Sequence, residues 1–196
     1  MPGWTSHEGR MVALPIENID TDQLIPARFM STPRSQGYGR FLLHDMARDA
    51  DGSLRPDFAL AAVPDASILI ARRNFGCGSS REAAVYALVD SGFRAVIAPS
   101  FGDIFASNAV NNGLLPAKVS EAEAEALMKE VDHSACIDLE RLEIVTGDLR
   151  IKFDLDPVWR TKLMNGWDDI DLTRDRADQI AEFRDRRKAG AAWAWV

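Results

Sequence analysis

The sequence has few of the residues that build disulfide frameworks or metal clusters, with two cysteines and three histidines in 196 residues. Cys77 and Cys136 lie far apart and form no Cys-x-x-Cys pair. This usage fits a reduced cytosolic protein better than a disulfide scaffold. Cys77 has two interpretations, a nucleophile near a helix start or a small buried thiol, and the second is the more ordinary one. His7, His44 and His133 show no spacing pattern that pairs them with a nucleophile.

The sequence also lacks the apolar and basic stretches that mark membrane and nucleic-acid partners. No apolar run approaches the roughly 18 residues of a transmembrane helix, and the first residues, MPGWTSHEGRM, contain no apolar segment of a secretory signal. The net charge is −7, and no basic block is interleaved with aromatic residues. We therefore expect a cytoplasmic protein that binds neither membranes nor nucleic acid. An anionic small substrate would need arginines clustered locally against the overall negative field.

The apolar residues that are present predict one α/β domain over residues 1–196. They make up 46% of the chain, without an internal repeat or a low-complexity linker. Residues 67–71 and 94–98 are apolar runs of strand length, and residues 80–90 carry apolar side chains on one helical face. A strand, a helix and a strand at this spacing form a crossover unit, so the two strands are expected to be parallel.

Weaker patterns add elements on both sides of this unit. Residues 11–14 predict a short strand, and residues 101–113 predict a short helix that ends at an Asn-Gly pair. The Ser-x-x-Glu sequence at 120–123 is a capping box before a helix to about Val131.

The C-terminal third changes period. Apolar residues alternate on both sides of Thr146-Gly147-Asp148, which predicts a hairpin and therefore a mixed sheet. Helices near residues 157–165 and 174–188 form a predicted helical extension over about 157–196, which ends in the apolar tail AAWAWV.

One long segment, at about 26–60, has little periodicity. Prolines and glycines interrupt it, with a short helix predicted near 41–48. Segments of this length without regular structure are usually functional or mobile. Arg28, Arg34 and Arg40 give it a local positive charge.

The stretch ARRNFGCGSSREAAVYAL joins the strand at 67–71 to the helix that follows. With Ser79 as N-cap, Glu82 falls at the third helical position, so the two residues form a capping box. The surrounding glycines permit positive φ and close backbone approach. The first helical turn then presents free N–H groups, and Arg81 adds a planar guanidinium, so the stretch can bind an anion.

Other functions of this stretch fail on spacing. A phosphate-binding Walker loop needs a lysine that is absent, and the third glycine of a dinucleotide fingerprint is replaced by Arg81. Gly-x-Ser-x-Gly does not occur here, which argues against a hydrolase nucleophile elbow. A helix cap without any ligand is the competing interpretation, and the residues alone leave both open.

Three stretches together carry a family resemblance: NIDTDQLIPARF (18–29), NFGCGSSREAA (74–84) and APSFGDIFASNAVNNGLLP (98–116). Their order and spacing resemble those of the small subunits of 3-isopropylmalate dehydratase, which are similar to the swivelling domain of aconitase. The resemblance extends over about residues 11–181. It implies an aconitase-like swivelling β/β/α domain with a mixed sheet.

The resemblance also implies a reaction and roles for residues. 2-Isopropylmalate would lose water and regain it at the neighbouring carbon, giving 3-isopropylmalate in leucine biosynthesis. Ser79 would be the base that takes the carbon-bound proton. Ser80 and Arg81 would hold the substrate and the developing charge.

The resemblance implies a carboxylate-binding arginine and a substrate-specificity loop in the long segment at about 26–60. Arg34, in PRSQGYG, and Arg28 are the candidate substrate-binding arginines, although solvated surface arginines would look the same. Phe29 and Met30 are candidates for the pocket that accepts the alkyl group, or else core residues. Asp20 and Asp22 resemble a metal or acid–base pair, but the resemblance favours a turn in which their side chains bind backbone N–H groups.

The implied reaction depends on a [4Fe–4S] cluster, whose ligands are cysteine thiolates. Two scattered cysteines are too few, so the resemblance implies a large subunit that carries the cluster. It therefore implies a heterodimer, or a dimer of heterodimers, acting on a small dicarboxylate.

One departure from the family bears on the substrate. Many bacterial relatives have histidine after Gly-Ser-Ser-Arg-Glu, and this chain has Ala83. A related hydro-lyase subunit for citraconate, 2-methylmalate or another substituted malate therefore stays open. So do a non-catalytic anion-binding module and, with a histidine close to Ser79, a serine hydrolase.

Overall fold

The computed structural model describes residues 2–49, 51–79 and 81–195. The predicted substrate residue Ser80 lies outside these ranges.

A seven-stranded sheet forms the centre of the described chain, in the order β4-β3-β2-β1-β5-β6-β7. The strands from β1 to β4 pair in parallel, and β5, β6 and β7 continue the sheet in antiparallel pairs. The predicted mixed sheet and the parallel crossover are therefore confirmed. The strands are β1 (Ser6–Leu14), β2 (Ala66–Ala71), β3 (Ala95–Ala98), β4 (Leu115–Lys118), β5 (Ser134–Asp138), β6 (Glu143–Thr146) and β7 (Leu149–Lys152).

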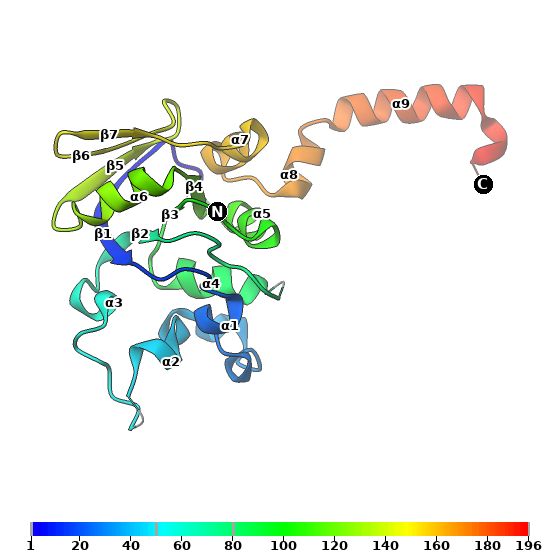
Figure 1. The fold of residues 1–196 in the computed structure, drawn as a ribbon. Coiled ribbons are helices and arrows are strands. Elements are labelled where there is room, and N and C mark those ends of the chain that lie inside the picture. The colour runs from blue at the N-terminus through cyan, green and yellow to red at the C-terminus, as the bar shows by residue number, and fades with distance from the viewer. Residues whose placement is uncertain (1, 50, 80, 196) are drawn as a thin grey trace.

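Helices cover both faces of the sheet (Figure 1). In chain order they are α1 (Thr21–Leu24), α2 (His44–Ala47), α3 (Ala59–Ala62), α4 (Glu82–Asp90), α5 (Asp103–Asn111), α6 (Glu121–Met128), α7 (Pro157–Asn165), α8 (Asp169–Arg174) and α9 (Ala177–Gly190). None of the helices in the described ranges is long and apolar enough to cross a membrane.

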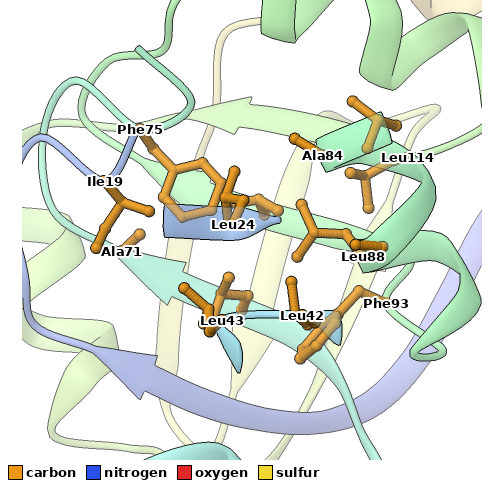
Figure 2. Packing of buried hydrophobic residues seen from close by; sticks show 14 of the residues in the cluster. Ile19, Leu24, Leu42, Leu43, Ala71, Phe75, Ala84, Leu88, Phe93 and Leu114 are labelled. Carbon is orange, nitrogen blue, oxygen red and sulfur yellow. The ribbon is translucent and has the colours of Figure 1, made fainter. Parts of the chain in front are cut away.

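Alternating strand residues build two apolar layers. In β2, Leu69 and Ala71 point to one layer, and Ile68 and Ile70 point to the other. The first layer packs against α1, α2 and α4, and Figure 2 shows its buried side chains around Leu24 and Leu88. The second layer lies under α6 and α7. A sheet buried on both faces explains why the parallel strands are continuously apolar in sequence.

The predicted cap at Ser79 is wrong. α4 begins at Glu82, Arg81 occupies its N-cap position, and no side chain caps it. The Ser79 carbonyl instead accepts a hydrogen bond from Thr21 Oγ1 at 2.6 Å, and Glu82 Oε1 accepts one from Asn112 Nδ2 at 2.9 Å. Contacts with other loops therefore override the local capping pattern.

Other boundaries follow the sequence more closely. The capping box of Ser120 with Glu123 and the hairpin of β6 and β7 are confirmed, although α6 ends at Met128. The predicted helix over 174–188 is instead α9, which starts at Ala177 after the separate α8. In Figure 1, α9 projects away from the sheet.

Candidate functional site

The three sequence motifs meet beyond the carboxyl ends of β1, β2 and β3. Backbone hydrogen bonds join them: Gly76 N donates to Ile19 O at 2.7 Å, and Gly102 N donates to Phe75 O at 2.9 Å. Thr21 N donates to the Cys77 carbonyl at 3.1 Å. We call residues 18–22, 74–79 with Arg81, and 100–105 the site junction. Carboxyl ends of parallel strands are the usual ligand position in such sheets.

Two glycines allow this close approach. Gly76 has φ of +71°, and a Cβ there would lie 2.2 Å from the Phe105 ring. At Gly102 a Cβ would lie 2.5 Å from the Gly76 carbonyl oxygen. Side chains at either position would push the loops apart, so space requires glycine at both positions, and at Gly76 the backbone conformation requires it as well.

Two asparagines also take left-handed backbone conformations in the junction. Asn18 and Asn74 have φ of 56° and 61°, and Asn74 Nδ2 donates to Asn18 Oδ1 at 2.8 Å. Asn74 N also donates to Ser100 Oγ at 2.8 Å. The amide side chains thus hold together the turns that begin two of the motifs.

A small cavity of about 180 Å³ opens at the junction. Ser79 is exposed at its rim, and Cys77 and Arg81 also line it. Asp103 and Ile104, at the start of α5, contribute the facing wall. The cavity therefore combines a hydroxyl, a guanidinium and the start of α4, which together suit an anionic group.

Arg81 forms an ion pair with Asp22 of α1. The Arg81 side chain is 21% exposed and the Asp22 side chain 51%. Asp20 has a different role: it caps α1 by accepting from Gln23 N at 2.7 Å, which confirms the predicted turn at this position. The Asp22 partnership was missed, because local spacing gives no signal for a pair 59 positions apart.

Arg34 lies away from this cavity. Its Nη2 donates to Asp90 Oδ1 at 2.8 Å, and its guanidinium lies over the Tyr86 ring at 4.3 Å. Asp90 ends the nine-residue α4, whereas Arg81 precedes its first residue. Arg34 and Arg81 therefore contact opposite ends of a helix about 13 Å long.

Arg28 and Phe29 lie, like Arg34, in residues 26–62, which we call the flanking segment. Arg28 pairs with Asp45, and its hydrogen bond holds the pKa of that carboxyl at about 2. Phe29 stacks on Phe41 with ring centroids 4.2 Å apart. Met30 is 41% exposed. Arg28 and Phe29 thus lie at the end of the first motif and Met30 directly after it, and the functional roles of all three stay predictions.

The histidines lie outside the residues that line the cavity. His7 hydrogen-bonds Ser67 Oγ at 2.8 Å, and burial lowers its pKa, with a smaller contribution from Arg94. His44 Nδ1 lies 3.0 Å from Asp45, and His133 approaches Glu130. None of them is placed as the base that a serine hydrolase would need beside Ser79.

Ala83 packs in the core. It is 7% exposed and belongs to the apolar layer under α4, not to the cavity wall. Alanine in place of the histidine of many relatives therefore affects core packing more directly than it affects the lining of the cavity.

Comparison with known proteins agrees with this geometry. The family model of the aconitase C-terminal domain matches residues 1–122. The chain therefore belongs to the aconitase C-terminal domain family and, within it, to the small subunits of 3-isopropylmalate dehydratase. The predicted family and fold class are confirmed.

Curated relatives match the chain over nearly its whole length. The 3-isopropylmalate dehydratase small subunit of Shouchella clausii is 45% identical, over 93% of this chain and 95% of that protein. The small subunit from Rhodopseudomonas palustris is 43% identical, over 99% of this chain. A crystal structure of 3-isopropylmalate dehydratase (leuD) from Methanocaldococcus jannaschii has a TM-score of 0.67 and 26% identity. It covers 90% of this chain and 98% of that chain.

Proposed function

We propose that the chain is the small subunit of a 3-isopropylmalate dehydratase, which converts 2-isopropylmalate to 3-isopropylmalate in leucine biosynthesis. The observation that carries this proposal is that all three family motifs meet in the site junction, around one cavity that suits an anion. The full-length similarity to curated small subunits supports it. We place the reaction in the cytoplasm, with a small dicarboxylate as substrate.

Ser79 is the proposed base. Its ionised oxygen takes the proton from the carbon next to a carboxylate, the C–H electron pair forms the double bond, and the hydroxyl group leaves with its bonding electron pair and takes up a proton from solvent to become water. The same steps in reverse then add water to the double bond, with the hydroxyl group and the hydrogen on exchanged carbons. Negative charge on the serine oxygen requires nearby positive groups, and Arg81 and the N-terminal end of the α4 dipole supply them.

Arg81 is the proposed carboxylate ligand. Asp22 already pairs with it, which fixes the guanidinium at the cavity. A guanidinium has five N–H donors, so one carboxylate does not exhaust it. The substrate carboxylate would bind the remaining donors, with Ser80 beside it as the resemblance implies.

The iron–sulfur cluster belongs to the proposed large subunit. Cys77 lines the cavity, whereas Cys136 lies in β5 opposite Val145, so the two thiols do not form one ligand set. The described residues contain no group of three metal-ligating side chains. When bound, the cluster supplies a Lewis acid for the departing hydroxyl group. This chain supplies the base and the carboxylate ligand.

Replacement of Ser79 tests the proposal. The Ser79→Ala variant is assembled anaerobically with the cluster-loaded large subunit, and absorbance of the unsaturated diacid is followed after adding 3-isopropylmalate. We expect kcat to fall about 10²- to 10⁴-fold, with unchanged affinity between subunits. Ser31→Ala is the matched control, because Ser31 is exposed in the flanking segment.

The wild-type complex separates the alternatives. Preference for citraconate over isopropylmalate would keep the mechanism and change the substrate. No turnover of either, despite an intact cluster and a formed complex, would leave an anion-binding module. A Ser79→Ala variant with more than a tenth of wild-type kcat would exclude Ser79 as the base.

A further inference from the structure

The C-terminal helices form an apolar groove that the mechanism does not use. Val158 of α7, Trp167 after it, Leu172 of α8, and Ile180 and Phe183 of α9 line this groove of about 730 Å³. We call it the arm groove. Phe183 is 59% exposed and Val158 51% exposed, so apolar area on both walls faces solvent. Polar and charged side chains, among them Asp175 and Arg176, line the rest of the groove. Apolar residues gathered in one groove mark an interaction site more often than scattered single residues do.

The body of the chain does not cover α9. The helix has 14 residues and none of them is buried, and it projects away from the sheet in Figure 1. Isolated helices of this length are marginal in water. A partner that covers Ile180 and Phe183 would supply the packing that α9 lacks.

The base of the arm is joined to the site by polar contacts. Lys162 of α7 is buried, its Nζ lies 2.7 Å from Asp169 Oδ1, and it also bonds the Asn111 side chain. The next residue, Asn112, donates to Glu82 at the start of α4. The arm is therefore fixed to the C-terminal end of α5.

The other end of α5 lines the cavity. Asp103 and Ile104 begin the helix there, and Ile104 is 53% exposed. The nine residues of α5 span about 13 Å. A macromolecule that covers the Ser79 cavity thus lies one short helix away from the arm groove.

We propose that the arm groove is a docking surface for the large subunit, which seats an apolar segment flanked by acidic residues. This rests on the proposed function, since that subunit must cover the Ser79 cavity. Asp185 pairs with Arg184, and Arg186, Arg187 and Lys188 leave the outer part of α9 basic, although the whole chain has a net charge of −7. This charge favours an acidic partner surface.

A second copy of this chain is the other occupant to be tested. A two-fold dimer would bring the same patch of both copies together. Curated relatives named small subunits match as much as 99% of this chain, so the extension lies within the matched length.

Paired substitutions test the groove in the full chain. Ile180→Asp with Phe183→Asp places two carboxylates on the apolar wall, while Leu54→Asp is the control at a residue that is 57% exposed and far along the chain. The Kd for the cluster-loaded large subunit is measured by biolayer interferometry. We expect the double variant to bind roughly 30-fold more weakly or worse, and the control to bind as wild type. Circular dichroism should show an intact sheet, and Phe183→Ala provides a milder variant.

The outcomes separate this proposal from the proposed function. At saturating large subunit, the double variant should reach the wild-type kcat, because no cavity residue has changed. Unchanged Kd for both groove variants, with an active wild-type complex, would overturn the docking surface alone. A free chain that sediments as a dimer and becomes a monomer in the double variant would assign the groove to a second copy. A wild-type pair that neither binds nor turns over isopropylmalate would overturn both proposals.

Discussion

The site junction and the flanking segment at 26–62 are both non-repetitive, yet different forces hold them. In the junction, backbone hydrogen bonds join loops from three parts of the chain. In the flanking segment, Leu42 and Leu43 pack into the core, and side-chain pairs hold the surface turns against each other and against α4: Arg28 with Asp45, Arg34 with Asp90, and Phe29 with Phe41.

This difference determines which substitutions each region can tolerate. Backbone geometry that depends on glycine leaves no alternative side chain, so the junction is fixed in shape. At the exposed ion pairs and stacked rings of the flanking segment, side chains can be exchanged at a modest cost in free energy. This tolerance does not extend to Leu43, which is buried in the core, or to Gly39, where a Cβ would lie 2.7 Å from the Asp90 carbonyl oxygen. A junction of fixed shape is what the proposed proton transfer by Ser79 needs, and the exposed side chains of the flanking segment are where the proposed substrate selection can vary.

Gly76→Ala should have the largest effect. The new Cβ would lie 2.2 Å from Phe105 with φ of +71°, so strain and overpacking together cost about 3 kcal/mol or more. Gly52→Ala in the flanking segment is the control, since its φ is +84° and nothing lies within 4 Å of the new Cβ. It should cost about 1–2 kcal/mol. Urea unfolding of both variants gives the two free energies, and equal losses would remove the contrast between the regions.

The sequence predicted the framework of the junction well. Apolar runs placed β2 and β3 around α4, because strands buried on both faces have little choice of residue type. The three motifs that carry the family resemblance meet in the structure through the hydrogen bonds of Gly76 and Gly102.

The side-chain contacts across the junction could not be predicted from the sequence. Ser79 and Glu82 have the spacing of a capping box, but Thr21 binds the Ser79 carbonyl and Asn112 binds Glu82. Asp22 and Arg81 meet only after β1 and β2 have paired. Such pairs depend on topology, which local periodicity does not encode.

Arg34→Lys should have the next largest effect. Lysine cannot reproduce the two-point contact with Asp90 or the position over Tyr86, so we expect a loss of about 1 kcal/mol. The KM for 3-isopropylmalate should stay within about threefold, because Arg34 lies at the far end of α4 from Arg81. A KM at least tenfold higher with unchanged stability would instead support the predicted role of Arg34 in carboxylate binding.

Substitutions at the adjacent residues Phe29 and Met30 should separate an effect on stability from an effect on substrate specificity. Phe29→Ala removes the stack on Phe41 and should cost about 1 kcal/mol. Met30→Ala should change stability by less than about 0.5 kcal/mol because Met30 is exposed. If Met30 contacts the alkyl group, the ratio of kcat/KM for isopropylmalate to that for citraconate should fall about tenfold. An unchanged ratio in both variants would remove the specificity role from this loop.

Lowering the pH should destabilise the flanking segment before it destabilises the junction. This is the smallest of the predicted effects, and it vanishes near neutral pH. The hydrogen bond from Arg28 lowers the pKa of Asp45 to about 2 in the folded chain, against about 3.9 in unfolded chains. The pair therefore stabilises the segment fully above pH 4, and this stabilisation is lost as pH falls through 2. Because both side chains are exposed, the gain in stability at neutral pH is small.

Amide exchange by mass spectrometry, corrected for intrinsic rates, should show protection around α2 falling between pH 4.5 and 2.5. Protection at Gly76 and Gly102 should fall later, since their backbone bonds do not titrate. Asp45→Asn should abolish the early loss, and a wild-type chain that loses protection in both regions together would show that the two are one cooperative unit.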